Sequence, residues 1–234
     1  MFYTRVMGRR GPKPRSVSSF EWTADIAYTV GLIATDGNLS IDGRHIVFVS
    51  KDIDQLETFK SILGLQHIKI GKSLGGQEHK TECFRVQFGD VSFYQWLVGI
   101  GLTPNKSKTI GPLTVPDEYF FDFLRGCFDG DGSIYAYWDS RWHSSYMFYI
   151  NFVSASIPFV EWLQGTTLRL CGVWGRITKG AQVFQLRYAK KETRIVAHKM
   201  YYSDTLPLLK RKFVKAKKIF TIDNRVSVRN ARVV

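Results

Sequence analysis

Hydrophobic positions along this 234-residue chain repeat one order of patterns. Apolar residues recur at helical spacing in some stretches, while apolar and polar residues alternate in others, as in strands with one buried face. After an apolar helix that ends at Asp36-Gly37, the patterns predict a hairpin of residues 38–42 and 45–50, a helix over 52–63, strands over 67–72 and 82–88, and a helix over 91–100. The predicted order is therefore helix, two strands, helix, two strands, helix.

The same order returns from residue 117. After a second apolar helix, the patterns predict strands over 133–138 and 147–154, a helix over 157–170, strands over 175–179 and 182–189, and a helix from about residue 193 to 203. Between the copies, residues 103–116 contain three prolines and a glycine, which oppose regular structure and predict a linker. We expect an α+β chain divided into a basic N-terminal arm (1–20), a first half (21–102), the linker (103–116), a second half (117–205) and a basic C-terminal extension (206–234).

The first helix of each copy carries a glycine five residues before an aspartate. These helices end in the segments TVGLIATDG (29–37) and LRGCFDGDG (124–132), so the internal glycines are Gly31 and Gly126. A glycine inside a helix costs about 1 kcal/mol relative to alanine. Its repetition at one offset indicates that the two helices pack against each other, backbone to backbone.

Each segment ends in Asp-Gly, at Asp36-Gly37 and Asp131-Gly132. We expect each final glycine to adopt the left-handed conformation that ends many helices. A carboxylate at a helix C-terminus meets the negative end of the helix dipole, which is unfavourable unless a cation lies there. Two packed helices with this ending therefore predict a metal site shared by Asp36 and Asp131.

The two segments resemble the motif of the LAGLIDADG homing endonucleases, and two copies in one chain are typical of the single-chain members. The resemblance implies two pseudo-symmetric αββαββα halves, which form a saddle of antiparallel sheets around the packed motif helices. The eighth motif position binds metal in this family and falls on Asp36 and Asp131. The first copy departs from the pattern at the sixth position, where it has Ala34 opposite Asp129, so Asp129 receives no ligand role. The backbone of Ala34 or Gly130 is a further candidate ligand.

The resemblance also implies a function. It predicts a monomeric endonuclease that cuts double-stranded DNA at a long recognised sequence with Mg²⁺, or Mn²⁺ in its place. The family places basic or polar residues around the metal, and Lys51, after the second strand, and Lys190, at the end of the last strand, are our candidates. The position in the second half that corresponds to Lys51 falls near Ala155, so the two active sites are expected to be unequal.

Alternation along the strands selects the residues that would read DNA, since one set of side chains packs on helices and the other faces outward. A one-residue error in register exchanges the two sets. The expected DNA-binding residues are Arg44, Lys69, Lys72, Arg85, Gln87, Tyr137, Arg141, Arg176, Lys179, Gln185 and Arg187.

Composition supports a polyanionic partner. The chain has 33 Lys and Arg against 20 Asp and Glu, a net charge of +13, with 14 basic and 11 acidic residues in 1–117 and 19 and 9 in 118–234. This excess favours nucleic acid, although it also suits a ribosomal or membrane-surface protein. The three cysteines and five histidines have no zinc-site spacing, and no apolar run approaches the roughly 20 residues that span a bilayer.

The two chain ends leave alternatives open. Residues 1–20 fit a DNA-groove arm, an organellar presequence or a solvated tail, and residues 206–234 fit an amphipathic basic helix. The compartment is therefore unassigned between a bacterial or archaeal cytoplasm and an organelle.

A protein of the same fold that binds DNA or intron RNA without cleavage, as a maturase or a regulator, is the main alternative function. The presence of both Asp36 and Asp131 argues against it, because carboxylates that face phosphates repel them without a metal. An intein is a weaker alternative, because the sequence shows no splicing block.

Overall fold

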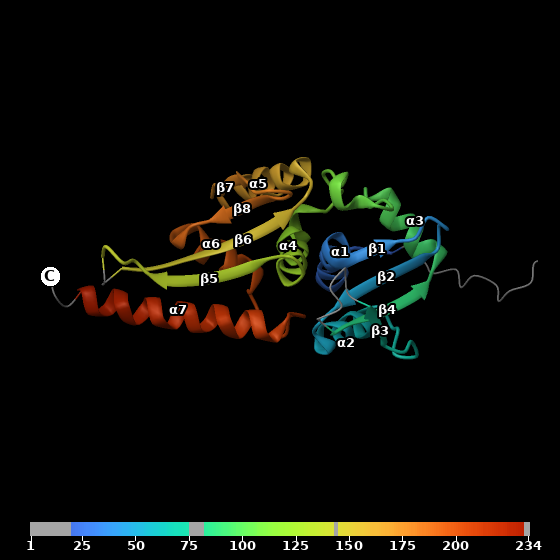
Figure 1. Ribbon diagram of the computed structural model, residues 1–234, viewed down its shortest axis with the longest axis horizontal. Coiled ribbons are helices and arrows are strands. Elements are labelled where there is room, and N and C mark those ends of the chain that lie inside the picture. The colour runs from blue at the N-terminus through green and yellow to red at the C-terminus, as the bar shows by residue number, and fades with distance from the viewer. Residues whose placement is uncertain (1–19, 75–81, 143–144, 232–234) are drawn as a thin grey trace, which may run out of the picture.

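Two antiparallel sheets of identical topology flank a central pair of helices in the computed structural model, which describes residues 20–74, 82–142 and 145–231 (Figure 1). The strand orders are β1-β2-β4-β3 and β5-β6-β8-β7. The first half contains α1 (Ala24–Asp36), β1 (Gly37–Leu39), β2 (His45–Ser50), α2 (Ile53–Ile62), β3 (Gly71–Leu74), β4 (Glu82–Gly89) and α3 (Val91–Gly99). The second contains α4 (Phe120–Asp129), β5 (Ser133–Trp138), β6 (Tyr146–Ser154), α5 (Ile157–Cys171), β7 (Arg176–Lys179), β8 (Phe184–Tyr188) and α6 (Lys190–Met200). The predicted α+β class and the αββαββα order of both halves are confirmed.

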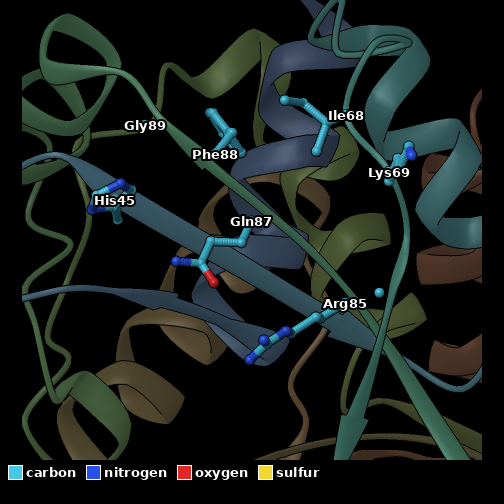
Figure 2. Close-up of a pocket in the computed structure, with 8 residues that line it drawn as sticks. His45, Ile68, Lys69, Arg85, Gln87, Phe88 and Gly89 are labelled. Carbon is cyan, nitrogen blue, oxygen red and sulfur yellow. The ribbon is translucent and has the colours of Figure 1, made fainter. Parts of the chain in front are cut away.

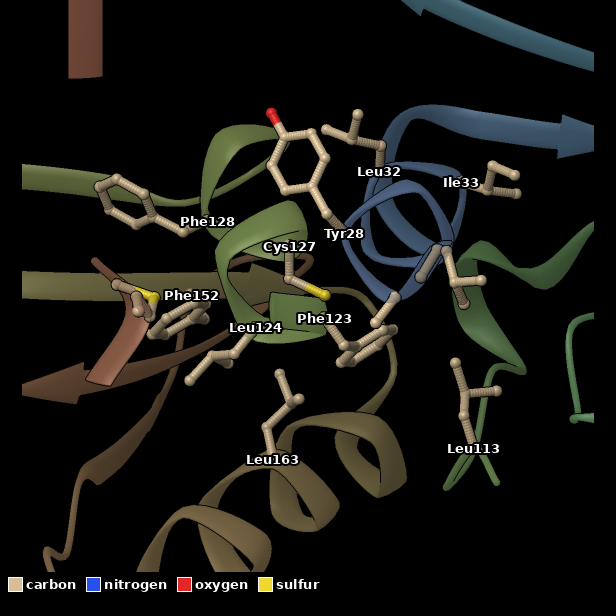
Figure 3. Packing of buried hydrophobic residues seen from close by; sticks show 14 of the residues in the cluster. Tyr28, Leu32, Ile33, Leu113, Phe123, Leu124, Cys127, Phe128, Phe152 and Leu163 are labelled. Atoms are coloured by element: carbon tan, nitrogen blue, oxygen red, sulfur yellow. The ribbon is translucent and has the colours of Figure 1, made fainter. Parts of the chain in front are cut away.

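The two motif helices, α1 and α4, meet at their internal glycines. A Cβ atom added to Gly31 would lie 2.2 Å from the carbonyl oxygen of Phe123, and one added to Gly126 would lie 2.1 Å from that of Tyr28. The Cα atom of each glycine lies 2.9 Å from the Cβ position of the other. The helices therefore touch along their backbones, with buried side chains of both helices around the contact (Figure 3).

A hydrophobic core continues from one half into the other through these helices. The inner face of the first sheet packs on α2, where the rings of Phe48 and Phe59 stack with centroids 4.6 Å apart. In the second half, Phe123 of α4 packs against Trp162 of α5, with ring centroids 5.5 Å apart. Buried residues of α1, α4 and both sheets belong to one contiguous cluster. The halves are thus fused by packing as well as by the chain.

The glycines that end the motifs are not left-handed, so that prediction is wrong. Gly37 is extended, with φ −90° and ψ 159°, and Gly132 is absent from the glycines with positive φ in the described part of the chain. A Cβ at Gly37 would lie 2.6 Å from the Cα of Ile33, and one at Gly132 would lie 2.6 Å from the Cα of Phe128. Glycine is needed here because the chain turns tightly against the last helical turn, which leaves no room for a side chain.

Element boundaries also differ from the prediction, most of all at β3 and α6. Residues 67–70 lie outside any strand, and β3 begins only at Gly71. Helix α6 begins at Lys190 rather than near Thr193, because the Thr193 hydroxyl donates to the carbonyl of Tyr188 and accepts from the amide of Ile150. Those two bonds hold the first turn of the helix directly against the sheet.

The basic extension forms one long helix, α7 (Lys210–Ala231), along the second half (Figure 1). Lys190 and Arg194 of α6 both pair with the buried Asp223 of α7. At its other end, Arg211 makes a bidentate ion pair with Asp52 at the start of α2, at 2.8 Å. Helix α7 therefore contacts both halves.

Two short 3₁₀ helices, Lys106–Lys108 and Asp117–Tyr119, lie in and just after the expected linker. No helix in the described ranges has the length and apolar character needed to cross a bilayer. Most of the basic arm, residues 1–19, lies outside the described residues.

Candidate functional site

The two motif aspartates lie together at the ends of α1 and α4. Asp36 is the last residue of α1, whereas α4 ends at Asp129, so that Asp131 follows the helix by two residues. Gly130 packs against the end of α1, where a Cβ would lie 2.0 Å from Thr35 Oγ1 and 2.9 Å from Asp36 Oδ2. The close glycine contact one turn earlier thus brings both carboxylates to one place.

Burial and mutual repulsion oppose ionisation of this pair. The pKa of Asp36 is raised to about 7, mainly by desolvation and also by the neighbouring Asp131 carboxylate, while Lys212 and Lys106 act in the opposite direction. Asp131 has an exposed edge, yet the surrounding protein desolvates it enough to raise its pKa as well. Two carboxylates in such a site favour the binding of a cation between them.

Two lysines that the sequence analysis missed flank the carboxylates. Lys106 donates to the carbonyl oxygen of Gly37, and Lys212 donates to that of Gly132 at 2.7 Å. Gly37 and Gly132 hold the same position in the two motifs, so the lysines are pseudo-symmetric partners. The pKa of each lysine is lowered to about 8, because desolvation outweighs the attraction of Asp36 and Asp131 and, for Lys212, that of Asp129.

Lys212 also closes the C-terminal end of α4. Besides that of Gly132, the carbonyl oxygens of Phe128, Asp129 and Gly130 lie 2.6, 2.9 and 2.8 Å from its ammonium nitrogen, so its three N–H groups are shared among four acceptors. A cation at this end of a helix is stabilised by the helix dipole. The carbonyl of Gly130, one of the candidate backbone ligands, is therefore already engaged, while Ala34 is buried in the last turn of α1.

The sequence carried only a weak signal for these lysines. Each follows the third helix of its half after a proline, two residues after Pro104 in one case and five residues after Pro207 in the other. The unequal spacing hides the equivalence, and Lys106 lies in a segment that resembles a plain linker.

The structure places the two lysines predicted from the sequence differently. Gly37 pairs with Phe48, three residues before Lys51, so the exposed Lys51 lies at the same end of the first sheet as Asp36. Lys190 instead opens α6 and contacts Asp223 Oδ1 at 2.5 Å and the carbonyl of Tyr146 at 3.0 Å. Tyr146 pairs with Trp138 at the far end of β5 from Asp131. Lys190 is therefore withdrawn as a catalytic candidate, because its ion pair with α7 holds it at the wrong end of the sheet.

Asp129, to which no ligand role was given, holds the start of α7 in place. Its buried Oδ2 accepts from the Tyr28 hydroxyl at 2.9 Å and from the amide of Leu209 at 2.6 Å. Burial raises the pKa of Asp129 to about 6. Because Leu209 precedes α7, this bond fixes the start of the helix that carries Lys212.

Each sheet has one face that no α-helix within the described ranges covers. Partners across the ladders and the alternation of buried residues place Asn38, Val47, Val49, Arg85 and Gln87 on this open face of the first sheet, and Tyr135, Tyr137, Tyr149, Asn151, Arg176, Gln185 and Arg187 on that of the second. Arg85 and Gln87 leave β4 beside a hollow of about 470 Å³, which His45 and Lys69 also line (Figure 2). Most of the expected DNA-binding residues therefore share these faces.

Lys72 and Lys179 do not lie on the open faces. Lys72 pairs with Phe84 and Lys179 with Phe184, and both phenylalanines pack against the core. These lysines therefore belong to the helix-covered faces, at the edge of each sheet. Lys179 lies three residues after Arg176 on β7, so alternation places these two side chains on opposite faces. Arg44 is exposed before β2, and Arg141 is exposed after β5, where it pairs with Asp139.

Comparisons with known proteins support the fold. No family model and no curated protein matches the chain. Among solved structures, the LAGLIDADG homing endonuclease I-LtrWI bound to target DNA is 13% identical, with a TM-score of 0.57 over 86% of this chain and 91% of that one. I-DmoI in complex with DNA and Ca is 15% identical, with a TM-score of 0.55 over 83% of this chain and 97% of that one.

The chain is also similar to full-length DUF199/WhiA from Thermatoga maritima. That structure is 13% identical, with a TM-score of 0.54 over 92% of this chain and 69% of that one. The N-terminal LAGLIDADG domain of DUF199/WhiA is similar as well. The chain thus has the LAGLIDADG homing endonuclease fold, as the two motifs predict.

Proposed function

We propose that the protein is a site-specific endonuclease that hydrolyses double-stranded DNA. The observation that carries the proposal is the joint position of Asp36 and Asp131 at one end of the packed motif helices, with Lys106 and Lys212 beside them. A protein that only binds DNA needs positive charge at this place. Two carboxylates would repel the phosphates there, so their presence favours catalysis.

The carboxylate pair fits a hard divalent cation, with Mg²⁺ as the expected metal and Mn²⁺ as an alternative. Oxygen ligands are those that Mg²⁺ prefers, and Mg²⁺ usually retains several waters beside one or two carboxylates. No group of three or more His, Cys, Asp and Glu side chains suited to a metal occurs within the described ranges, so phosphate oxygens of DNA would complete the shell. Similar structures were determined with Ca and in the presence of Mg. When bound, such a cation polarises the phosphate and activates water.

The lysines contribute fixed positive charge to the same reaction. Their hydrogen bonds to main-chain carbonyls hold the ammonium groups in place before DNA binds. A positioned cation stabilises the charge that develops on the phosphate in the transition state. With pKa values near 8, both lysines are largely protonated at pH 7. Lys51 remains a proposed contributor at the rim of the first half.

The second candidate function is binding of DNA or intron RNA without cleavage. The fold alone does not separate the two functions, because the similar structures include both homing endonucleases and DUF199/WhiA. Since one chain provides both halves of the site, we propose that either activity belongs to a monomer, which sedimentation of the protein alone and with DNA would test.

Cleavage selection on random double-stranded DNA tests the proposal. We expect the full chain with Mg²⁺ to enrich and cut one sequence family, Asp36→Asn and Asp131→Asn to bind the enriched DNA without cutting it, and EDTA to abolish cutting. Glu161→Gln, which changes an exposed carboxylate on α5, serves as the control and should cut normally. Enrichment of bound DNA without cutting by the unaltered protein, under Mg²⁺ or Mn²⁺, would instead support the non-cleaving function.

A further inference from the structure

The open faces of the two sheets can be superimposed residue by residue. Asn38 and Ser133 each follow the final glycine of a motif, and they pair with Val47 and Asn151, respectively. Val47 and Asn151 are therefore equivalent positions on the central strands. The next strand of each sheet can then be aligned through its ladder with these two residues.

On the next strands, arginine and glutamine exchange places. Val47 pairs with Gln87, while its equivalent Asn151 pairs with Arg187. Two residues further along the central strands, Val49 pairs with Arg85 and Val153 pairs with Gln185. The first half thus presents Arg85 and Gln87, and the second presents Gln185 and Arg187, in the opposite order. The residues between them, Val86 and Leu186, are buried, so all four side chains start from the open faces.

The two side-chain types read different bases. In the major groove, arginine donates two hydrogen bonds to O6 and N7 of guanine, whereas glutamine bonds to N6 and N7 of adenine. An antiparallel ribbon fits this groove, and a pseudo-two-fold protein places equivalent residues on equivalent base pairs of the two half-sites. An exchange of Arg and Gln between the halves therefore changes the sequence that each half prefers.

We propose that the DNA target departs from two-fold symmetry at the two base-pair positions that these residues read, with guanine and adenine interchanged between the half-sites. Arg187 and Arg85 select guanine, and Gln87 and Gln185 select adenine. This assignment rests on the proposed function, since it requires that the open faces bind the DNA major groove.

Arg187 is held in place before DNA binds. Its Nε donates to Asn151 Oδ1 at 3.0 Å, and its guanidinium carbon lies 5.7 and 5.4 Å from the ring centroids of Tyr135 and Tyr149. These two rings stack with centroids 5.3 Å apart. No residue in the described part of the chain accepts a hydrogen bond from either Nη group of Arg187, so both can donate to a base. Arg85 is exposed on β4, and the described residues give it no such support. Because an ordered side chain loses less entropy on binding, Arg187 discriminates more strongly than Arg85.

Base-preference profiles of the cleaved DNA test this assignment. In Arg187→Gln, we expect guanine to be replaced by adenine at one position, with a change in preference of about tenfold or more, and all other positions unchanged. Gln87→Arg should make the opposite change at the equivalent position of the other half-site. The double variant should cut a target in which these two bases are exchanged. Tyr149→Ala should weaken the guanine preference at the Arg187 position alone.

Lys179→Gln is the matched control, because it removes a charge from the helix-covered face of the same sheet and should leave the profile unchanged. A uniform loss of affinity for all sequences in Arg187→Gln would overturn the proposal, as it would identify a phosphate contact. If the unaltered protein selects a sequence and the exchanges leave its profile unchanged, this inference fails alone. If the unaltered protein selects no sequence, the proposed function fails. Thermal unfolding of each variant shows that its fold is intact.

Discussion

Gly31 is one of the two glycines at which the motif helices touch, and it leaves no space for a side chain. A methyl group there would lie 2.2 Å from a main-chain oxygen of the opposite helix, which cannot move as a side chain can. We expect Gly31→Ala to lower the free energy of unfolding by more than about 3 kcal/mol, in the range of severe overpacking. Gly165→Ala is the control, because a Cβ at this position of α5 meets nothing within 4 Å and should leave stability unchanged or raise it by up to about 1 kcal/mol. Urea unfolding measures both, and equal effects would contradict the close contact of the helices.

Asp36 makes the metal-free protein less stable as pH rises. Its folded-state pKa is about 7, above the ordinary value of 3.8, so the folded state favours the protonated form. Its contribution is most favourable below pH 4, declines between pH 4 and 7, and is constant above pH 7. We expect Asp36→Asn to stabilise the metal-free protein by about 1–2 kcal/mol at pH 8, after allowance for solvent screening, and little at pH 4.

Thermal unfolding at the two pH values in EDTA checks this expectation. Added Mg²⁺ should then stabilise the unaltered protein at pH 8 and have little effect on Asp36→Asn. A variant that is less stable at pH 8 than the unaltered protein would show that the carboxylate is stabilised by its lysine neighbours rather than strained.

Substitution of Lys106 tests the site with less disturbance than substitution of Lys212, because Lys106 contacts one carbonyl oxygen at a helix end and Lys212 contacts four. In the unaltered protein the ammonium group of Lys106 is buried beside both carboxylates. We expect Lys106→Gln to slow cleavage by about 100-fold, comparable with the loss of one oriented donor to a transition state. Lys108→Gln, two residues further along and exposed, is the control and should retain full activity. Similar cleavage rates for the two variants would remove Lys106 from the site.

At the scale of the element, α7 depends on one buried carboxylate. Asp223 accepts ion pairs from Lys190 and Arg194 and is itself almost fully buried. Removal of one partner from a buried ion pair commonly costs about 3–5 kcal/mol. Because both cations are partly exposed, we expect a smaller loss of about 2–3 kcal/mol for Asp223→Ala, with faster amide exchange along α7. Asp204→Ala, at an exposed position before α7, should change neither.

At the scale of the whole molecule, the two halves share a core and are expected to unfold together. The motif helices touch along their backbones, and Arg211 of α7 pairs with Asp52 of the first half. Loss of one half would expose the buried face of the other. We therefore expect far-UV circular dichroism and tryptophan fluorescence to follow one coincident urea transition, since tryptophans such as Trp96 and Trp162 lie in different halves. Two separated transitions would show that each half is stable alone.

Much of this organisation was accessible from the sequence. The repeated glycine and Asp-Gly ending predicted the packing of two helices and the meeting of Asp36 and Asp131, because a glycine at one fixed offset in both helices serves close approach. Alternation predicted the strands of both sheets and their order along the chain. Local patterns sufficed for the helices and strands, because these depend on residues near one another in the chain, and the repetition of one motif sufficed for the pairing of the two helices.

Other features depend on contacts between distant segments. Lys72 and Lys179 were assigned to the wrong face, because the face of an edge strand that meets the core is decided by how the whole sheet packs on the helices, and their partners Phe84 and Phe184 lie on that face. Lys106 and Lys212 were missed for a related reason. Lys106 reaches a carbonyl 69 residues away and Lys212 one 80 residues away. The sequence by itself determined the helices, the strands and the two acids at the centre, and only the tertiary structure decided which cations face them, because charge and burial act through space rather than along the chain.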